Sequence, residues 1–444
     1  MFLSLLPKRS FVAALCILVL SSGICHGGSR EGPARLYFLY PISSPYYPVI
    51  LTGEFLTTLI DVPADALSLY AVGPSGLAPI PFQIDGRDAM GRYEIPVTAA
   101  EIAAAGARGF DFNDECVFMA ADLGKKADGL SITFQGARVT EIELADPRTD
   151  QRGWVYAVVG TRDSVQRSPV DYVAYDKGRD AVESHVYKAA FSRETTFLLN
   201  RLEWKHSGTF KGSPDLTDTM KAKHQGRLLH SLTFERTQGD SETKLLGVKD
   251  GPVRVIRSSA SRVRVIMKMR TPEIYVNNIH YGNAFFMDTH IRIPFRIGLF
   301  FSDLNTIMTM DGNDDPRLPP ATLYTPSRGE GALIDGRMSP QEEAINGSKD
   351  QSLIIDTVYG KILVSLEHER GMPIDYRVYV KDDRNAADPP ETIPGQFGNV
   401  GFLTTGWEKL EPALYHMVFN VYMVRGMSVE QGFDLLKQAP RFAP

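Results

Sequence analysis

Residues able to move protons gather in the stretch FFMDTHIRIPFRIG, residues 285–298, and just before it. If this stretch is a strand, its side chains alternate between two faces, and Asp288, His290 and Arg292 share one face. A carboxylate fixes the tautomer of a neighbouring imidazole and raises its basicity, so Asp288 and His290 form a candidate proton-transfer pair. Tyr281 could exchange a proton if guanidinium groups lowered its pKa, and Arg292 could neutralise a substrate carboxylate. This is the chemistry of β-elimination on a uronate sugar, and it makes His290, Asp288, Tyr281 and Arg292 the candidate catalytic residues.

The same row of side chains has two other interpretations. It could be a non-catalytic face that binds a ligand, or an ordinary solvated face with cross-strand ion pairs, as most charged strand faces are. Zinc is not favoured, because His280 and His290 lack a tight ligand spacing and no cysteine pair supports them.

A second candidate site is a basic strand, RVRVIMKMR (262–270), which places several cations on one face. Cations about 7 Å apart on one sheet face repel each other unless acids, water or an anionic ligand lie between them. If the strand at 285–298 pairs nearby, its arginines enlarge this patch. The predicted ligand-binding residues are Arg254, Arg262, Arg264, Lys268, Arg270, His280 and Arg296, and the predicted ligand is an anionic polysaccharide.

The acidic run DGNDD (311–315) places oxygen ligands at alternate positions, as calcium loops do. It departs from an EF-hand, because Pro316 and Thr322 stand where glycine and glutamate are needed. Asp311, Asn313 and Asp315 are therefore candidate calcium ligands, and ordinary turn hydrogen bonding is the alternative. The sequence demands no cofactor.

The first residues indicate export. Lys8 and Arg9 precede the apolar run FVAALCILVL, and small residues follow up to Gly27, which is the order of a signal peptide over residues 1–27. A lipid anchor on Cys25 is the rival, but Ile24 is bulky where a small residue is wanted. We therefore expect a periplasmic or extracellular protein. Cys116 would be its one cysteine, so no internal disulfide is expected.

This 444-residue chain has ordinary globular composition, 43% hydrophobic and 23% charged. The net charge of −5 argues against nucleic acid as a partner, and no later stretch is apolar enough to cross a bilayer. Many short segments rich in aromatic and β-branched residues predict strands. Capping boxes at Thr98 and Ser428 predict two short helices.

The predicted fold is therefore mainly β with few short helices. A small N-terminal β-sandwich domain (33–147) is followed by a linker at 145–153 and a larger antiparallel, supersandwich-like β-sandwich (153–444). Within the larger part we expect hairpins over 253–270 and 353–369, a long loop or lid over 206–228, and irregular excursions over 311–350.

Two parts of the chain resemble secreted carbohydrate-acting proteins. The pattern P-x-Q-x-D followed by D-E-x-x-F resembles small β domains that precede a larger sandwich in such proteins, and it is filled by Pro81, Gln83, Asp85, Asp114, Glu115 and Phe118. VESHVYKAAF (182–191) and DGPVRVIR (250–257) look like the sheets of galactose-mutarotase-like supersandwiches and related lyases. The resemblance implies a fold and a carbohydrate-directed role, while its motifs are structural rather than catalytic.

These observations lead to one principal hypothesis and one alternative. The principal one is an exported, carbohydrate-directed protein that cleaves or binds an anionic glycan over its basic sheet face. The alternative is a non-enzymatic accessory protein that docks to a partner in the cell envelope.

Overall fold

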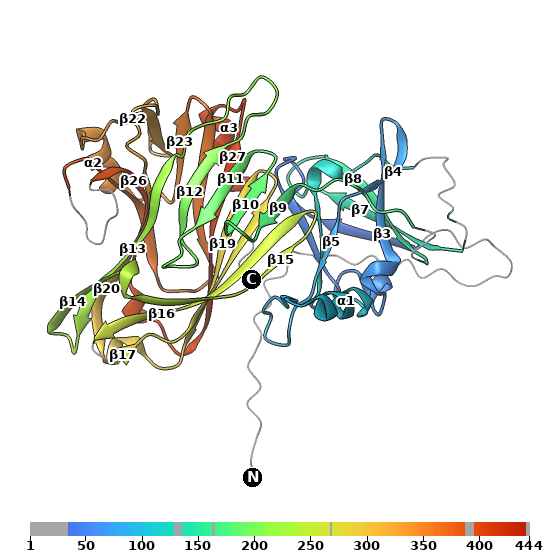
Figure 1. Cartoon of the computed structure of the whole chain (residues 1–444), viewed down its shortest axis with the longest axis horizontal. Helices are drawn as coiled ribbons and strands as arrows, with labels where there is room; N and C mark the ends of the chain where they lie inside the picture. Colours follow the sequence, from blue (N-terminus) through green and yellow to red (C-terminus); the bar gives the residue numbers. More distant parts are fainter. Residues whose placement is uncertain are drawn as a thin grey trace, which may run out of the picture.

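The computed structural model describes residues 34–127, 134, 136–161, 165–266, 269–386 and 395–440, and Figure 1 shows its course. The signal peptide predicted over residues 1–27 and the predicted ligand-binding Lys268 lie outside the described residues. The protein is mainly β, as predicted, with five sheets and three α-helices in the described part. None of the described helices is long and apolar enough to span a membrane.

Two sheets form the N-terminal part, drawn in blue and teal in Figure 1. The first has the order β1-β7-β8-β3-β4, with strands β1 (Ala34–Leu39), β7 (Arg138–Ala145), β8 (Arg152–Val159), β3 (Leu67–Gly73) and β4 (Gly76–Ile80). The second has the order β2-β6-β5, with strands β2 (Pro48–Thr52), β6 (Glu115–Met119) and β5 (Gln83–Asp85). Only β1 and β7 of these strands pair in parallel. Helix α1 (Ala99–Ala107) lies beside them, and its predicted capping box between Thr98 and Glu101 is present.

The linker predicted at 145–153 is wrong. This segment is the turn of a hairpin, because β7 and β8 pair with each other from Arg138↔Val159 to Ala145↔Arg152. Its Asp, Pro and Gly residues are turn formers as well as linker formers, so composition could not separate the two. Division of the chain into two domains stays a prediction, and this pairing would place the boundary after Val159.

A ten-stranded sheet organises the rest of the chain. Its order is β15 (Ser241–Asp250), β16 (Arg254–Ile266), β18 (Ile274–Tyr281), β19 (Ala284–Ile293), β27 (Ala413–Val424), β24 (Gly360–His368), β23 (Ser352–Thr357), β21 (Ala321–Thr325) and β22 (Arg328–Ile334), with β17 (Met269–Arg270) paired to β16. A four-stranded sheet has the order β12 (Leu199–Trp204), β11 (Tyr187–Phe191), β10 (Ala181–Ser184) and β9 (Val173–Asp176). A five-stranded sheet has the order β14 (Leu232–Thr237), β13 (Thr217–Leu228), β20 (Phe301–Gly312), β26 (Gln396–Thr405) and β25 (Asp375–Asp383).

The ten-stranded sheet is covered on both faces. On one face, Ile256 and Phe286 share a buried cluster with Phe118 of the N-terminal part and with Phe433 of helix α3 (Val429–Gln438). On the other face, different clusters join the sheet to the four-stranded and the five-stranded sheets. Because a strand alternates its side chains, one strand of this sheet serves two different interfaces.

Three local predictions in the larger part are corrected. The hairpin predicted over 253–270 does not turn at SSAS, because these residues include no glycine, proline or asparagine to reverse the chain. Strand β16 runs through them from Arg254 to Ile266, and β17 pairs back with its end. The lid predicted over 206–228 contains the twelve-residue strand β13, which pairs with β20. The excursions predicted over 311–350 contain β21, β22 and helix α2 (Pro340–Asn346).

Two other local predictions are confirmed. The hairpin predicted over 353–369 is formed by β23 and β24, with Gly360 in a positive-φ conformation at its turn. Helix α3 follows the capping box of Ser428 and Gln431.

Candidate functional site

The register of the ten-stranded sheet brings one carboxylate and two imidazoles together. Asp288 and His290 lie two residues apart on β19 and share a face, and His416 of β27 lies directly opposite His290. The two imidazole rings stack with 4.5 Å between their centroids. Three ligand atoms, one from each side chain, lie within 4.8 Å of one another.

The Asp288 carboxylate is the centre of this cluster. It is buried and contacts Nε2 of both histidines, at 3.2 Å for His290 and in a close contact with His416. Asn277 Nδ2 donates to the carboxylate at 3.1 Å, and Ser258 donates to the Asn277 carbonyl. Burial alone would raise the pKa of Asp288, but the charges and hydrogen bonds of His416 and His290 outweigh it and hold that pKa well below its usual range.

These ligand types suit a transition metal. Two imidazole nitrogens and one carboxylate oxygen form the donor set of many Zn²⁺ and Fe²⁺ sites, in which the remaining positions take water or substrate. Calcium prefers six to eight oxygens, so this cluster is not typical of calcium. The network through Asn277 would orient the carboxylate, as hydrogen bonds behind metal ligands commonly do. Nδ1 of His416 is buried and has no hydrogen-bond partner among the described residues.

Sequence reasoning missed His416. It expected a strand at 416–424, but His416 lies 128 residues from Asp288, and only the pairing of β19 with β27 joins them. Two histidines on strands far apart in the sequence show no ligand spacing. The sequence therefore gives no sign of a zinc site that only strand pairing assembles.

The cluster borders the N-terminal part of the chain. The Arg87 guanidinium lies 3.5 Å from the centroid of the Tyr93 ring, and Asp288 is among the acids whose charge acts on Arg87. Tyr275 pairs with His290 across β18 and β19, and the Arg92 guanidinium lies over the Tyr275 ring at 5.5 Å. An aromatic ring and a half-exposed arginine therefore stand beside His290, whose side chain is 20% exposed.

Arg254 is fully buried and joins the two parts of the chain, so it does not belong to an exposed basic face. Its guanidinium contacts Asp85 at 2.7 Å and Glu115 at 2.5 Å, and its backbone nitrogen donates to Gln83 Oε1 at 3.1 Å. Lys249 completes the cluster with a contact of 2.8 Å to Asp85. Asp85 of the pattern P-x-Q-x-D and Glu115 of the pattern D-E-x-x-F therefore form ion pairs with Arg254. Their role is structural.

Tyr281 belongs to the same buried network. Arg254 Nη1 donates to the Tyr281 hydroxyl at 3.0 Å, as the predicted guanidinium contact requires. Burial nevertheless dominates the charge of Arg254 and raises the pKa of Tyr281 to about 12. The condition for proton exchange by Tyr281, a pKa lowered by guanidinium groups, is therefore not met, because the sequence shows the cation but not the burial.

His280 is a core residue and not a surface ligand. Its ring is fully buried, stacks on Phe285 with 5.4 Å between centroids, and its Nδ1 lies 3.1 Å from the Tyr187 hydroxyl. Burial lowers the pKa of His280 to about 3, so the ring stays neutral. Its side chain points to the opposite face of the sheet from Asp288, which separates it from the cluster.

The remaining predicted cations are exposed, and most are paired with acids. The pairs are Arg262 with Glu273 at 3.1 Å, Arg264 with Asp240 at 3.8 Å, Arg270 with Glu242 at 2.6 Å and Arg296 with Glu411 at 2.6 Å. Arg292 is exposed on the same face as His290. Cross-strand neutralisation of this kind matches the plainer interpretation of a solvated face.

The predicted calcium ligands do not form one loop. Asp311 lies within β20, is buried, and contacts Lys221 Nζ at 2.8 Å. The Asn313 backbone nitrogen donates to the Leu216 carbonyl at 2.9 Å, and Asp315 forms an ion pair with Arg317. Calcium binding at these residues stays a prediction.

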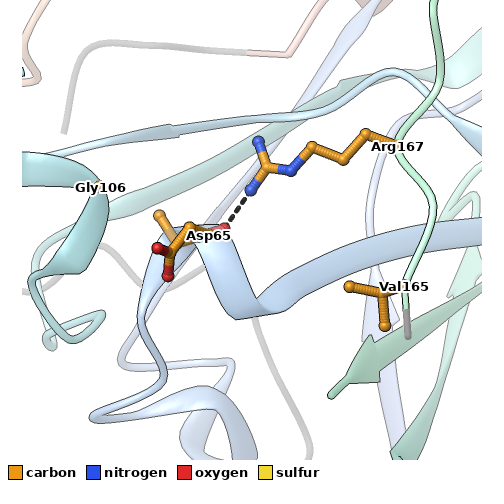
Figure 2. Close-up of a pocket in the computed structure, with 5 residues that line it drawn as sticks. Asp65, Gly106, Val165 and Arg167 are labelled. Carbon is orange, nitrogen blue, oxygen red and sulfur yellow. Dashed lines mark hydrogen bonds between the residues drawn. The ribbon is translucent and has the colours of Figure 1, made fainter. Parts of the chain in front are cut away.

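A small hollow in the N-terminal part has a volume of about 410 Å³ and is lined by Asp65, Gly106, Val165 and Arg167 (Figure 2). The Arg167 guanidinium donates to the backbone carbonyl of Ala64. Among the described residues, the lining of the hollow holds no second acid, histidine or nucleophile, so it offers little for chemistry.

Comparison with known proteins adds little to this geometry. No family model and no curated protein matches the chain. Among solved structures, the chain is similar to a protein in the glycosyl hydrolase family 38 from Enterococcus faecalis, with a TM-score of 0.41 and 9% identity. The match covers 90% of this chain and 46% of that one, so the chain spans less than half of that protein's length. A likeness this distant carries no argument about substrate or mechanism.

Proposed function

We propose that the protein binds a divalent transition metal, of the zinc class, through Asp288, His290 and His416, and that this centre serves a carbohydrate-directed role toward an anionic glycan. The observation that carries the proposal is the meeting of three ligand atoms within 4.8 Å on one sheet face. The low pKa of Asp288 keeps this carboxylate ionised at neutral pH, and an ionised carboxylate is the form that binds metal.

The surroundings of the centre support the choice of an anionic sugar. The Tyr275 ring offers an apolar face of the kind that stacks on a sugar. The Arg92 guanidinium beside it pairs with Asp88 at 2.7 Å and is 42% exposed, so its remaining N–H groups can bind a substrate carboxylate. A bound metal would neutralise a uronate carboxylate and so acidify the neighbouring carbon–hydrogen bond. His290, the partly exposed imidazole of the cluster, would hold the metal, so the proton would pass to solvent.

Metal binding is the first test. Metal-free full-length protein is titrated with Zn²⁺ in competition with a chromophoric chelator, and the wild type is expected to bind one ion per chain. His290→Ala and His416→Ala should each weaken binding about 10- to 100-fold or more, because each removes a ligand. Arg292→Ala is the matched control, since Arg292 lies on the same strand and face and should leave binding unchanged. Equal binding by all four proteins would contradict the assignment.

The glycan role needs a separate test. The metal-loaded protein is incubated with a panel of uronic-acid polysaccharides, and the absorbance of unsaturated products and retardation in affinity electrophoresis are followed. Product formation that Tyr275→Ala and Arg92→Ala both reduce would support elimination at this centre. Silence in both assays, with metal bound, would refute the carbohydrate role and leave the accessory role as the better account.

A further inference from the structure

The face of the ten-stranded sheet opposite Asp288 lines a large cavity. It has a volume of about 1140 Å³ and lies between this sheet and the five-stranded sheet, at the end where β14 and β17 stand at the lower left of Figure 1. Val276, Met287 and Ile291 line it from one sheet, and Ala222 and Met308 line it from the other. The odd-numbered side chains of β19 from Met287 to Ile293 therefore border a hollow at this end.

The size of the cavity argues for an occupant. Protein interiors are close-packed, and voids larger than a water molecule are few. This hollow opens to solvent, so without a ligand it would leave a large apolar lining in contact with water. Water is a poor filling, because aliphatic and aromatic side chains dominate the lining and give it few hydrogen-bond partners.

The polar groups of the lining have one sign of charge. Arg236 and Arg270 line the cavity, and no aspartate or glutamate does so among the described residues. Arg270 already pairs with Glu242 outside the lining, which leaves Arg236 as the candidate for an anionic group. Arg236 Nε donates to the carbonyls of Arg264 and Val265, at 3.0 and 2.7 Å, which holds the guanidinium at the edge of β16. His224 is partly buried in the lining and is hydrogen-bonded to Thr306 at 3.0 Å, so it adds a polar group to the cavity wall.

The rim of the cavity exposes apolar side chains to solvent. Leu229 is 60% exposed, and its backbone nitrogen donates to the Phe300 carbonyl at the end of the β13–β20 pairing. Met269, Phe295 and Phe300 are also exposed, and the last two rings pack edge to face. Soluble proteins seldom gather exposed apolar residues in this way unless the patch meets a ligand or a surface.

We propose that this cavity binds an amphiphile with one long aliphatic chain and an anionic head group. The chain lies between the two sheets, against Met287 and Met308, and the head group lies at Arg236. Apolar lining and adaptable methionines suit a flexible chain, and the arginine without a lining acid suits a carboxylate or a phosphate. A free fatty acid and an acyl phospholipid share this chemistry. The proposal is independent of the metal centre, which lies on the other face of the sheet.

The test uses delipidated full-length protein and displacement of the fluorescent probe anilinonaphthalene sulfonate. Palmitate is expected to displace the probe at a stoichiometry near one per chain. Met287→Trp fills the cavity and should weaken palmitate binding about tenfold or more, whereas Val358→Trp, on an exposed turn far from the lining, should not change it. Arg236→Gln should weaken palmitate binding and leave binding of hexadecanol, which has no charge, unchanged.

The outcomes distinguish a fatty acid from a phospholipid as the ligand, and they distinguish failure of amphiphile binding from failure of metal binding. Displacement by lysophosphatidate but not by palmitate would identify a phospholipid head group within the same chemistry. Failure of all three amphiphiles, or equal binding by Met287→Trp and wild type, would overturn the proposal. If Met287→Trp does not fold, a diazirine-labelled fatty acid is photo-crosslinked to the wild-type protein instead. Labelled peptides from β18, β19 or β20 are expected, and labelling elsewhere would refute the proposal. His290→Ala should retain full amphiphile binding, so loss of metal binding leaves this test intact.

Discussion

Replacement of Arg254 by methionine should destabilise the protein more than any other single loss of charge at the sheet. The substitution keeps an unbranched, apolar side chain of similar length but removes the guanidinium that contacts Asp85 and Glu115. Breaking a buried ion pair typically costs about 3–5 kcal/mol, because the remaining charge stays buried without its partner. Lys249 still contacts Asp85, and Arg87 still contacts Glu115, so we expect a cost at the lower end, about 3 kcal/mol.

The destabilisation caused by Arg254→Met should depend on pH in a definite direction. Burial alone would raise the pKa of Asp85, but Arg254 and Lys249 outweigh it and lower that pKa from 3.8 to about 2. A folded-state pKa below the unfolded value stabilises the fold above the unfolded pKa, and this contribution is lost as the pH falls from 3.8 toward 2. The shift corresponds to about 2 kcal/mol. The difference between Arg254→Met and wild type should therefore be large at neutral pH and shrink as the pH falls through this window.

Urea unfolding followed by tryptophan fluorescence, at neutral pH and near the lower end of the native range, measures both effects. Arg262→Met is the matched control, because Arg262 lies on the same strand and face but is exposed and pairs with Glu273 at the surface. Exposed pairs contribute about 0–1 kcal/mol, so this control should change little at either pH. If Arg254→Met cost no more than Arg262→Met, or if its cost did not depend on pH, the buried cluster would not hold the N-terminal sheets to the ten-stranded sheet.

Three further outcomes follow from individual residues. Arg292→Ala should change the free energy of unfolding by less than about 0.5 kcal/mol in urea titration, because this side chain is exposed; a larger loss would place it in a buried contact. Ser428→Ala should cost about 1 kcal/mol, since it removes the N-cap that accepts from the Gln431 nitrogen, and helix α3 should fray first in hydrogen exchange. Cys116 should resist a thiol-reactive dye in the native protein and react fully in denaturant, because the thiol is buried and burial raises its pKa to about 12; fast labelling of the native protein would contradict this burial.

Local signals predicted local structure well. The capping boxes at Thr98 and Ser428 act through hydrogen bonds within one turn, and both helices begin where these boxes place them. The hairpin at 353–369 likewise depends on a turn glycine and two short strands. The polar, aperiodic composition of residues 206–228 led to the wrong prediction of a loop or lid. Most side chains of β13 are of intermediate burial, so the strand shows no clear alternation of polar and apolar residues.

The candidate site was half predictable for the same reason. Alternation along β19 correctly placed Asp288 and His290 on one face, and the structure joins them at 3.2 Å. Alternation could not tell which residues a third layer covers. Arg254 and Arg262 share one face of β16, yet the N-terminal sheets bury the first and leave the second in solvent.

Alternation along β19 also explains how one strand could serve two ligands of opposite character. Asp288 and His290 point toward the N-terminal part, where Asn277 and His416 complete a polar centre, while Met287 and Ile291 point into the apolar cavity. Neighbouring residues of one strand therefore face environments separated by the thickness of the sheet. A substitution at 287 should alter amphiphile binding without altering metal affinity, and a substitution at 290 should do the reverse. Coupling between the two ligands would require β19 itself to shift, and its ten paired residues with β27 make such a shift costly.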